Sequence, residues 1–430
     1  MSAPEKVNVD EVDFFVDNDV LADPYEYLAT LRGECPVRRE SHHDVVMITG
    51  YDEALAIYND PAKFSSCISV GGPFPGFPVP LEGDDISELI EQHRSELIMN
   101  DQLPTMDPPM HTAHRALLLR MITPKRLKDN ETFMWRLADQ QLDAILTGDR
   151  CEFNGEFATP FAMLVIADLL GVPESSHEEF RTALLSGTDI GSSSGAAMDH
   201  SPLGYLYAKF AEYIEDRRRT PRGDVLTGVA SATFPDGSIP AVSDAVAVAA
   251  NLFAAGQETT VRLLSFAVKH IAEDPELQAR LRADRSLLPA FIEETLRFES
   301  PVRGDFRLSK VPVTVGDVDL PAGTTVMLIN AALNRDPRKF AEPDVFDIDR
   351  PNARSHVAFG RGVHSCPGAP LARAEALISL QLLLDRTTDI WIDEQKHGPV
   401  DNRRYQYLPT FVLRGLTKLH IGFSLSGSDG

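Results

Sequence analysis

FGRGVHSCPG, residues 359–368, is the stretch of this sequence that decides the fold. A helix-forming run begins directly after it, so Cys366 lies just before the amino terminus of a predicted helix. Unpaired N–H groups and the helix dipole stabilise negative charge there, which favours a thiolate over a thiol. The glycines at 360, 362 and 368 permit tight turns and the close approach of a flat ligand. A buried structural cysteine is the alternative for an isolated Cys, and the combination of residues argues against it.

The 430-residue chain has the composition of a globular protein with a substantial core, at 43% hydrophobic and 24% charged residues. Its 64 acidic and 41 basic side chains give a net charge of −23, which disfavours binding to nucleic acid or anionic membranes. The sequence shows no secretory signal pattern and no run of about 18 apolar residues, so we expect a cytoplasmic protein without membrane insertion. Cys35, Cys67, Cys151 and Cys366 are too dispersed to form a disulfide framework.

The chain contains no fixed-period repeat and no low-complexity linker, so we expect one domain over residues 1–430, with residues 1–20 as a loosely ordered arm. Helical periodicity predicts helices over residues 51–60, 109–121, 130–147, 157–170, 203–218, 243–273, 275–283, 287–298 and 369–385. Short strand-like stretches lie near residues 44–49, 311–314, 325–330 and 409–422. The predicted fold class is mainly α, with small antiparallel β-sheets.

The Phe, Gly, His, Cys and Gly of residues 359–368 together resemble the heme-binding loop of the cytochrome P450 family. The overall character of the chain, including residues 64–85, resembles the soluble bacterial, actinobacterial members of that family. The resemblance implies the helical fold of that family and heme b as cofactor. It also implies that Cys366 is the axial ligand of the heme iron and that His364 lies near a heme propionate. Phe359 would pack beside the sulfur, and Gly360 and Gly368 would contact the cofactor.

The apolar stretch predicted as the long helix 243–273 contains an acidic residue, Glu258, and a hydroxyl residue, Thr259. Ala255 and Thr259 are four residues apart and share a helix face, with Gly256 beside them. The glycine alone costs about 1 kcal/mol in a helix interior, which makes this stretch a candidate functional site rather than a kinked core helix. In the family this sequence covers the distal side of the heme, so the resemblance implies cofactor contacts for Ala255 and Gly256 and catalytic roles for Glu258 and Thr259.

Three basic residues match the propionate-binding residues of the family. His111 and Arg115 are four residues apart in DPPMHTAHR, at the start of a predicted helix, and Arg307 lies in SPVRGDFR. The resemblance implies that these side chains hold the heme propionates through charge-assisted hydrogen bonds. A solvated helix face is the alternative for the first pair.

Glu294 and Arg297 are three residues apart on one helix face, where they can pair. The resemblance implies that they form a structural ion-pair network with Arg350 of FDIDR. Such a pair on its own is usually a solvated surface pair. In the family it is buried and supports the cysteine loop.

The resemblance implies a monooxygenase that inserts one oxygen atom from O2 into a C–H bond, with Cys366 supplying electron density and Glu258 and Thr259 supplying protons. No flavin, nicotinamide or iron–sulfur motif is present, so a ferredoxin with its reductase is the expected electron donor. Residues 350–373 carry four arginines and no acid, and residues 110–128 carry five Lys or Arg and no acid. These segments are expected either to form a docking surface for an acidic ferredoxin or to hold the propionates, and the chain is expected to be a monomer.

The substrate is expected to be a hydrophobic small molecule such as a terpenoid, fatty acid or steroid. Residues 71–80 and 187–195 are interpreted as surface loops or as covers over an apolar pocket. The expected pocket also draws on residues 407–411, and its other candidate residues are Phe74, Phe77, Ile98, Met99, Asn251, Val302 and Asp305.

Three other functions are weighed against this one. A zinc site would use His356, His364 and Cys366, but their spacing fits no common zinc ligand set. A heme gas sensor would need no acid–alcohol pair. A heme-thiolate peroxygenase would commonly replace that pair, so Glu258 and Thr259 favour the monooxygenase over both.

Overall fold

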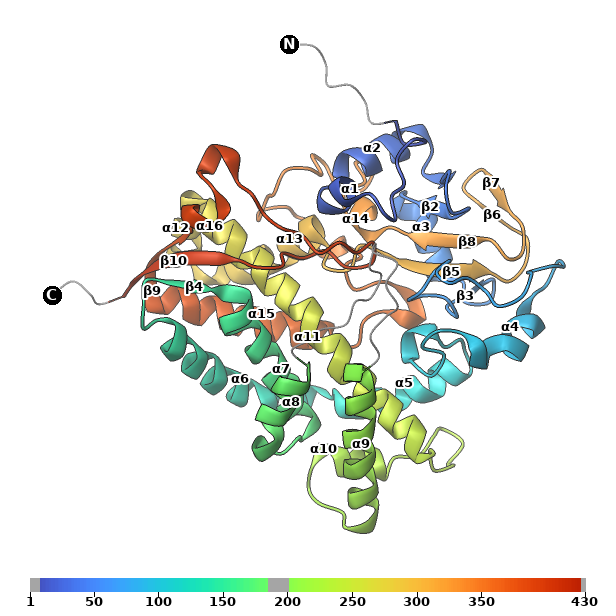
Figure 1. Cartoon of the computed structure of the whole chain (residues 1–430), viewed down its shortest axis with the longest axis horizontal. Helices are drawn as coiled ribbons and strands as arrows, with labels where there is room; N and C mark the ends of the chain where they lie inside the picture. The colour runs from blue at the N-terminus through green and yellow to red at the C-terminus, as the bar shows by residue number, and fades with distance from the viewer. Residues whose placement is uncertain (1–7, 185–200, 427–430) are drawn as a thin grey trace.

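The computed structural model describes residues 8–184 and 201–426, and one long helix runs through its centre (Figure 1). This helix, α11 (Val242–Glu273), has 32 residues and is therefore about 48 Å long at 1.5 Å per residue. Its Ala, Val, Leu and Phe side chains are buried on most sides, as expected for a core helix. At its start Asp244 accepts a hydrogen bond from the N–H of Ala241 at 3.0 Å. The helix runs through Gly256 without a break.

The predicted helices are present, with shifts of a few residues at their ends. The largest shift is in α6, which begins at Pro124 because the Thr123 hydroxyl caps it by accepting from the N–H of Arg126. The longer helices are α2 (Tyr25–Glu34), α3 (Tyr51–Tyr58), α5 (Met110–Met121), α6 (Pro124–Ile145), α7 (Thr159–Leu170), α8 (His177–Leu184), α9 (Ser201–Arg219), α12 (Pro275–Ala283), α13 (Leu288–Glu299) and α15 (Ala369–Arg386). Shorter helices are α1 (Asn18–Ala22), α4 (Ser87–His93), α10 (Val225–Ala230), α14 (Asn330–Leu333) and α16 (Glu394–His397).

The helices α7, α9, α13 and α15 pack on α11, and α6 packs on α7 and α15. All of them contribute to the same hydrophobic core cluster. Gly256 explains the close packing of α7 on α11, because a Cβ atom there would lie 3.3 Å from Cδ1 of Ile166. This glycine therefore serves helix packing as well as access to the backbone.

Three small sheets lie at the edges of the helical layer (Figure 1). A five-stranded sheet has the order β1-β2-β8-β5-β3, a three-stranded sheet has the order β4-β10-β9, and β6 pairs with β7. The pair β2–β8 is parallel, with Val46 opposite Val326, whereas the other pairs are antiparallel. The strands are β1 (Val37–Arg39), β2 (Val46–Ile48), β3 (Phe64–Ser65), β4 (Arg150–Glu152), β5 (Asp305–Ser309), β6 (Val313–Val315), β7 (Val318–Leu320), β8 (Thr325–Leu328), β9 (Thr387–Ile392) and β10 (His420–Leu425).

The strand predicted over residues 409–422 is only partly correct. Its first half makes two isolated bridges, Val302 with Leu413 and Tyr407 with Leu416, and continuous pairing begins only at His420. Val412 and Leu413 of this segment line the central cavity described below.

Residues 8–20 differ from the loosely ordered arm that the sequence predicts. Phe14 and Phe15 are fully buried, and the Phe15 ring contacts the rings of Phe74, Phe306 and Phe411. Asp13 also lies 2.7 Å from Nε2 of His43. Burial of two phenylalanines is worth several kcal/mol, which is enough to hold this segment on the second core cluster.

The carboxylate of Glu294 is the centre of a buried ion-pair network. Arg297 binds both of its oxygens at 2.7 Å, and Nε of Arg350 lies 3.2 Å from Oε1. The Glu294 and Arg297 side chains have no exposed surface. Arg297 and Arg350 also donate to backbone carbonyls of residues 334–345, so this network fixes the segment that leads to Cys366.

Within residues 8–184 and 201–426, no helix combines the length and the apolar character that crossing a membrane requires.

Candidate active site

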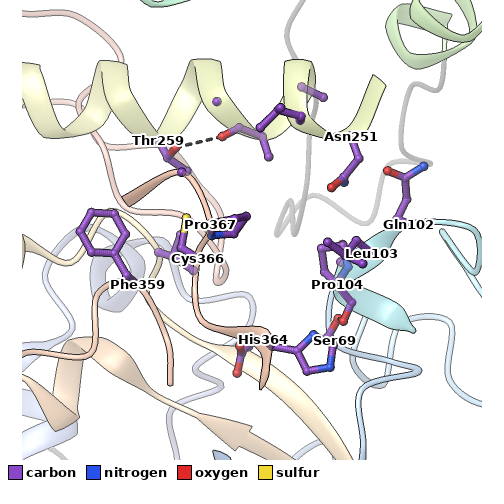
Figure 2. A pocket seen from close by; sticks show the side chains of 18 of the residues that line it. Ser69, Gln102, Leu103, Pro104, Asn251, Thr259, Phe359, His364, Cys366 and Pro367 are labelled. Atoms are coloured by element: carbon purple, nitrogen blue, oxygen red, sulfur yellow. Dashed lines mark hydrogen bonds between the residues drawn. The ribbon is translucent and has the colours of Figure 1, made fainter. Parts of the chain in front are cut away.

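Cys366 lies at the end of a tightly turned loop just before α15. Its N–H donates to the carbonyl of Phe359 at 2.8 Å, which closes the loop. Gly360 and Gly362 have φ values of +63° and +68°, in the left-handed region that favours glycine. A Cβ atom at Gly362 would also overlap the carbonyl oxygen of Tyr58. This backbone turns the sulfur of Cys366 toward α11, on the side of Thr259 (Figure 2).

The pKa of Cys366 differs from the sequence-based expectation. Burial raises the pKa of this thiol, although the N–H groups of Gly368 and Ala369 and the charges of Arg115 and Arg373 act in the opposite direction. The helix start therefore lowers the pKa, as predicted, but the enclosed position outweighs it. The sulfur is nevertheless accessible from the cavity that it lines.

The space between Cys366 and α11 is a cavity of about 380 Å³ with mainly apolar walls. Its volume is within the range of small-molecule sites. The structure brings together in its walls many of the site residues proposed from the sequence: Met99, His111, Arg115, Asn251, Ala255, Gly256, Glu258, Thr259, Val302, Asp305, Arg307, Phe359, His364, Cys366 and Gly368. The sequence did not point to Ser69, Gln102, Leu103, Pro104, Ile166, Leu252, Val412 and Leu413.

Four nitrogen-bearing side chains gather on one side of the cavity. The rings of His111 and His364 lie 4.0 Å apart, and Arg115 donates to the carbonyl of Ser365 at 2.6 Å. Arg307 lies 3.4 Å from Asp305, which itself accepts from Tyr58. Burial, reinforced by Arg115, lowers the pKa of His111 to about 4, and burial with Arg307 lowers that of His364.

These side chains fit a ligand with carboxylate groups. Both ring nitrogens of His111 and Nε2 of His364 are buried without a hydrogen-bond partner among the described residues. Buried polar atoms are normally paired, so three such atoms beside two guanidinium groups indicate an anionic, oxygen-bearing ligand. Heme carries two propionate groups and an iron that a cysteine can bind. The histidine and arginine side chains of the cavity match the propionates, and Cys366 matches the iron.

Thr259 and Glu258 lie on the cavity side of α11 but already have partners. The Thr259 hydroxyl donates to the carbonyl of Ala255 at 2.9 Å, which keeps its lone pairs available to a ligand. Arg262 binds Glu258 at 3.2 Å and also donates to the carbonyl of Leu416. Arg262 therefore fixes the position of the acid.

A second ion-pair network, which the sequence did not predict, lies under the Cys366 loop. Arg373 binds both oxygens of Glu293, at 2.5 and 2.9 Å, and His356 lies 3.1 Å from the same carboxylate. Arg373 and His356 outweigh burial and lower the pKa of Glu293 to about 2. The guanidinium carbon of Arg373 lies 4.7 Å from the centre of the Phe359 ring, so this network supports the residue whose carbonyl holds Cys366.

Glu375 is a buried acid that the sequence analysis also missed. It accepts a hydrogen bond from the Thr260 hydroxyl at 3.0 Å, while its other oxygen has no partner among the described residues. Burial raises its pKa to about 8. The available signal was a carboxylate on the same face of α15 as Leu371 and Ile378, where only apolar residues are expected.

Several predicted positions do not reach the cavity. Phe74, Phe77 and Ile98 are absent from its walls, because Phe74 packs on Phe15, His43 and Phe411 and Phe77 packs near His93. Residues 187–195 lie outside the described residues. The part of residues 407–411 expected at the pocket is replaced by Val412 and Leu413. His356 faces Glu293, and no cluster of three His, Cys, Asp or Glu able to hold a metal ion occurs in the described part of the chain.

Comparison with known proteins gives one consistent result. A family model described as Cytochrome P450 matches residues 238–403. The structure of CYP150A6, a cytochrome P450 of Mycobacterium marinum in the substrate-free form, has a TM-score of 0.93 and 52% identity, covering 98% of this chain and 100% of that chain. Cytochrome P450 144 of Mycobacterium tuberculosis is 33% identical over 95% of this chain and 90% of its own length. The cytochrome P450 monooxygenase PikC of Streptomyces venezuelae is 33% identical over 94% and 92%. The predicted mainly α fold with small sheets is thereby confirmed.

The buried carboxyl group of Glu375 makes folding stability depend on pH. Because its pKa is about 8 in the folded chain and about 4.5 in the unfolded chain, the folded state binds more protons between these values. Its contribution to stability is complete below pH 4.5 and is lost as the pH rises toward 8, by at most about 1.4 kcal/mol per pH unit. Glu375→Gln should remove this slope, so the variant gains stability relative to the wild type between pH 5 and 8.

Thermal unfolding midpoints of the heme-loaded protein at pH 5 and pH 8 measure this difference. Glu82→Gln, at an exposed position, is the control and should follow the wild type at both pH values. Equal pH dependence of the wild type and Glu375→Gln would show that Glu375 does not titrate in this range.

Proposed function

The chain belongs to the cytochrome P450 family and is a heme-thiolate monooxygenase with heme b as cofactor, and on this premise we propose which of its residues perform the reaction. Cys366 is proposed as the ligand of the heme iron. His111, Arg115, Arg307 and His364 are proposed to bind the propionates. The observation that carries this assignment is the position of the Cys366 sulfur, which faces the Thr259 side of α11 across a cavity bordered by unpartnered histidine nitrogens.

Bound heme supplies the activation of dioxygen, and the thiolate of Cys366 increases the electron density that favours O–O cleavage. The protein then has to deliver protons to the distal side. Thr259 is proposed to hold a proton at its hydroxyl, since its own donated bond goes to Ala255 and its lone pairs remain available. Glu258 is proposed to pass protons to Thr259. The ion pair between Glu258 and Arg262 limits the positions that the Glu258 carboxylate can adopt.

Replacing the sulfur ligand gives a spectroscopic test of Cys366. The reduced, carbon-monoxide-bound wild type should show the red-shifted Soret band of thiolate ligation, because Cys366 would supply a thiolate to the heme iron. Cys366→Ser should lose this band. Cys151→Ser is the control, since Cys151 lies on β4 away from the cavity, and it should keep the band. Retention of the band in Cys366→Ser would exclude Cys366 as the ligand.

Thr259→Ala separates oxygen consumption from product formation. The variant should consume NAD(P)H through its donor system but release most of the reducing equivalents as peroxide, because the hydroxyl that holds the proton is gone. Thr260→Val is a matched control, since the Thr260 hydroxyl donates to Glu375. The measurement is peroxide formed per NAD(P)H consumed. An unchanged ratio in Thr259→Ala would remove Thr259 from the reaction.

We further propose that a small acidic ferredoxin, reduced by its reductase, delivers the electrons. Arg350 and Arg373 bind buried carboxylates, so they are not available for docking. Arg120, Lys125 and Arg354 are exposed, and within the described residues they have no carboxylate partner. Exposed apolar side chains accompany them: Leu119 on α5 is 48% exposed, and Val363 beside the Cys366 loop is 40% exposed. The bond from Arg115 to Ser365 joins α5 to this loop.

Electrostatic docking predicts that the rate of reduction by a ferredoxin depends on salt. The second-order rate constant should fall steeply between about 0.05 and 0.3 M ionic strength, because the Debye length shortens over this range. Lys125→Ala with Arg354→Ala should lower the rate at low salt and make its salt dependence shallower. Arg39→Ala, at an exposed site paired with Asp44 on another part of the surface, should change neither. A rate that does not depend on salt would contradict this docking.

The substrate is proposed to be a hydrophobic small molecule of the terpenoid, fatty acid or steroid type. The support is a mainly apolar wall that includes Leu103, Ile166, Leu252, Val302 and Leu413. A ligand that fills this space gains about 25 cal/mol for each Å² of apolar surface removed from water.

A further inference from the structure

The polar groups at the end of the cavity away from Cys366 are arranged differently from those near the sulfur. Figure 2 shows Asn251 and Gln102 together at this end, with Cys366 and Phe359 at the other. Both residues line the cavity. The Asn251 side chain makes no hydrogen bond to any residue among 8–184 and 201–426. It therefore offers one carbonyl oxygen and an NH2 group to a ligand.

The orientation of the Gln102 amide follows from its neighbours. Asp101 can only accept, so the Tyr207 hydroxyl donates its proton to Asp101, at 2.7 Å. The Tyr207 oxygen must then accept from Gln102, and Nε2 of Gln102 donates to it. Nε2 also lies 3.3 Å from Oδ1 of Asp101. The NH2 group of Gln102 therefore points away from Asn251. The carbonyl oxygen of Gln102, Oε1, lies on the side of Asn251, as Figure 2 shows.

The other polar side chains of the cavity are already engaged or lie elsewhere. The Ser69 hydroxyl donates to the carbonyl of Pro104 at 2.7 Å, and Thr259 donates to Ala255. The two lining arginines, Arg115 and Arg307, both act on His364 and belong to the proposed propionate site. Among the described residues that line the cavity, none at the Asn251 end is a cation. Asp101, which contacts Gln102 and Tyr207, adds negative charge near this end.

The spacing fits a ligand that reaches from one end to the other. Asn251 and Thr259 are eight residues apart on α11, which corresponds to about 12 Å along the helix. A molecule bound by its polar end at Asn251 would place a carbon about that far away beside Thr259, above Cys366.

We propose that Asn251 and Gln102 form a recognition site for a neutral hydroxyl group, so that the substrate is a hydrophobic alcohol oxidised roughly 12 Å from its hydroxyl. This inference rests on the proposed function and narrows its substrate class. A hydroxyl donates its proton to Oε1 of Gln102 and accepts from the Asn251 amide. A carboxylate has no proton to donate and would face the Gln102 oxygen without a compensating cation. A sterol-like or terpenoid alcohol is therefore favoured over a fatty acid.

Three probes with the same chain test the head group: 1-decanol, its methyl ether 1-methoxydecane and decanoate. The ether can accept but not donate, and decanoate carries a charge. Binding is measured on the heme-loaded protein by the low-spin to high-spin shift of the Soret band. We expect 1-decanol to bind about 5- to 10-fold more tightly than the ether, as one hydrogen bond would give, and decanoate to bind most weakly.

Variants identify the residues that read the head group. Asn251→Leu and Gln102→Met should each reduce the preference for the alcohol over the ether to about 2-fold or less. Met99→Leu, an apolar wall residue, is the control: it should change the affinity for the alcohol and the ether by the same factor. Because Gln102 is buried, Asn251→Leu provides the decisive comparison if Gln102→Met folds poorly.

The outcomes distinguish this proposal from the proposed function. The reduced carbon monoxide spectrum is recorded first, and loss of the thiolate band would contradict the heme ligand and not the hydroxyl site. With that band present, equal affinities of the wild type for alcohol and ether would overturn the hydroxyl site. Tightest binding of decanoate would overturn it as well, in favour of a fatty acid. An unchanged preference in Asn251→Leu would exclude Asn251 as the recognition residue.

Discussion

The buried contact between Glu294 and Arg297 is the interaction on which the site depends. A charge with no exposed surface is stable only if its partners are fixed, and here Arg350 and several backbone carbonyls of residues 334–345 complete the set. Removing one member would leave the others buried and unpaired. The same contacts hold the segment between α14 and the Cys366 loop. Since this segment has little regular structure, charge pairing replaces the support that a helix or sheet would give.

The carboxylate of Glu293 supports the loop that carries the Cys366 sulfur. Glu293 precedes Glu294 in α13, and the two acids point to different partners, Glu293 to Arg373 of α15 and to His356. Arg373 in turn lies over Phe359, whose carbonyl accepts from the N–H of Cys366. Two adjacent acids on one helix therefore tie together the segments before and after the cysteine. The position of the sulfur depends on α13 although α13 does not touch the cavity.

The sequence was informative where the signal is local, and less so where it depends on distant packing. The Cys366 loop, the acid and alcohol of α11 and the Glu294–Arg297 spacing are short patterns whose geometry is fixed within a few residues. Phe74 and Phe77 were predicted in the cavity wall, but such aromatic residues in a turn-rich segment can cover a pocket or join a core. Phe74 lies in the core because its ring packs on Phe15 and Phe411, which are far away in the sequence. The orientation of Gln102 depends on Tyr207, about 100 residues later, and no sequence pattern reports that contact.

Burial acts in the same direction on four titratable groups along the cavity. It raises the pKa of Cys366 and of Glu375 and lowers the pKa of His111 and His364, so each of these groups shifts toward its neutral form. The cost of holding a charge in this space is therefore high unless a partner compensates for it. Arg115 and Arg307 provide that compensation on the side of His364. At the opposite end, Asn251 and Gln102 offer only neutral dipoles, so the same physical cause that sets these pKa values also selects a neutral ligand there.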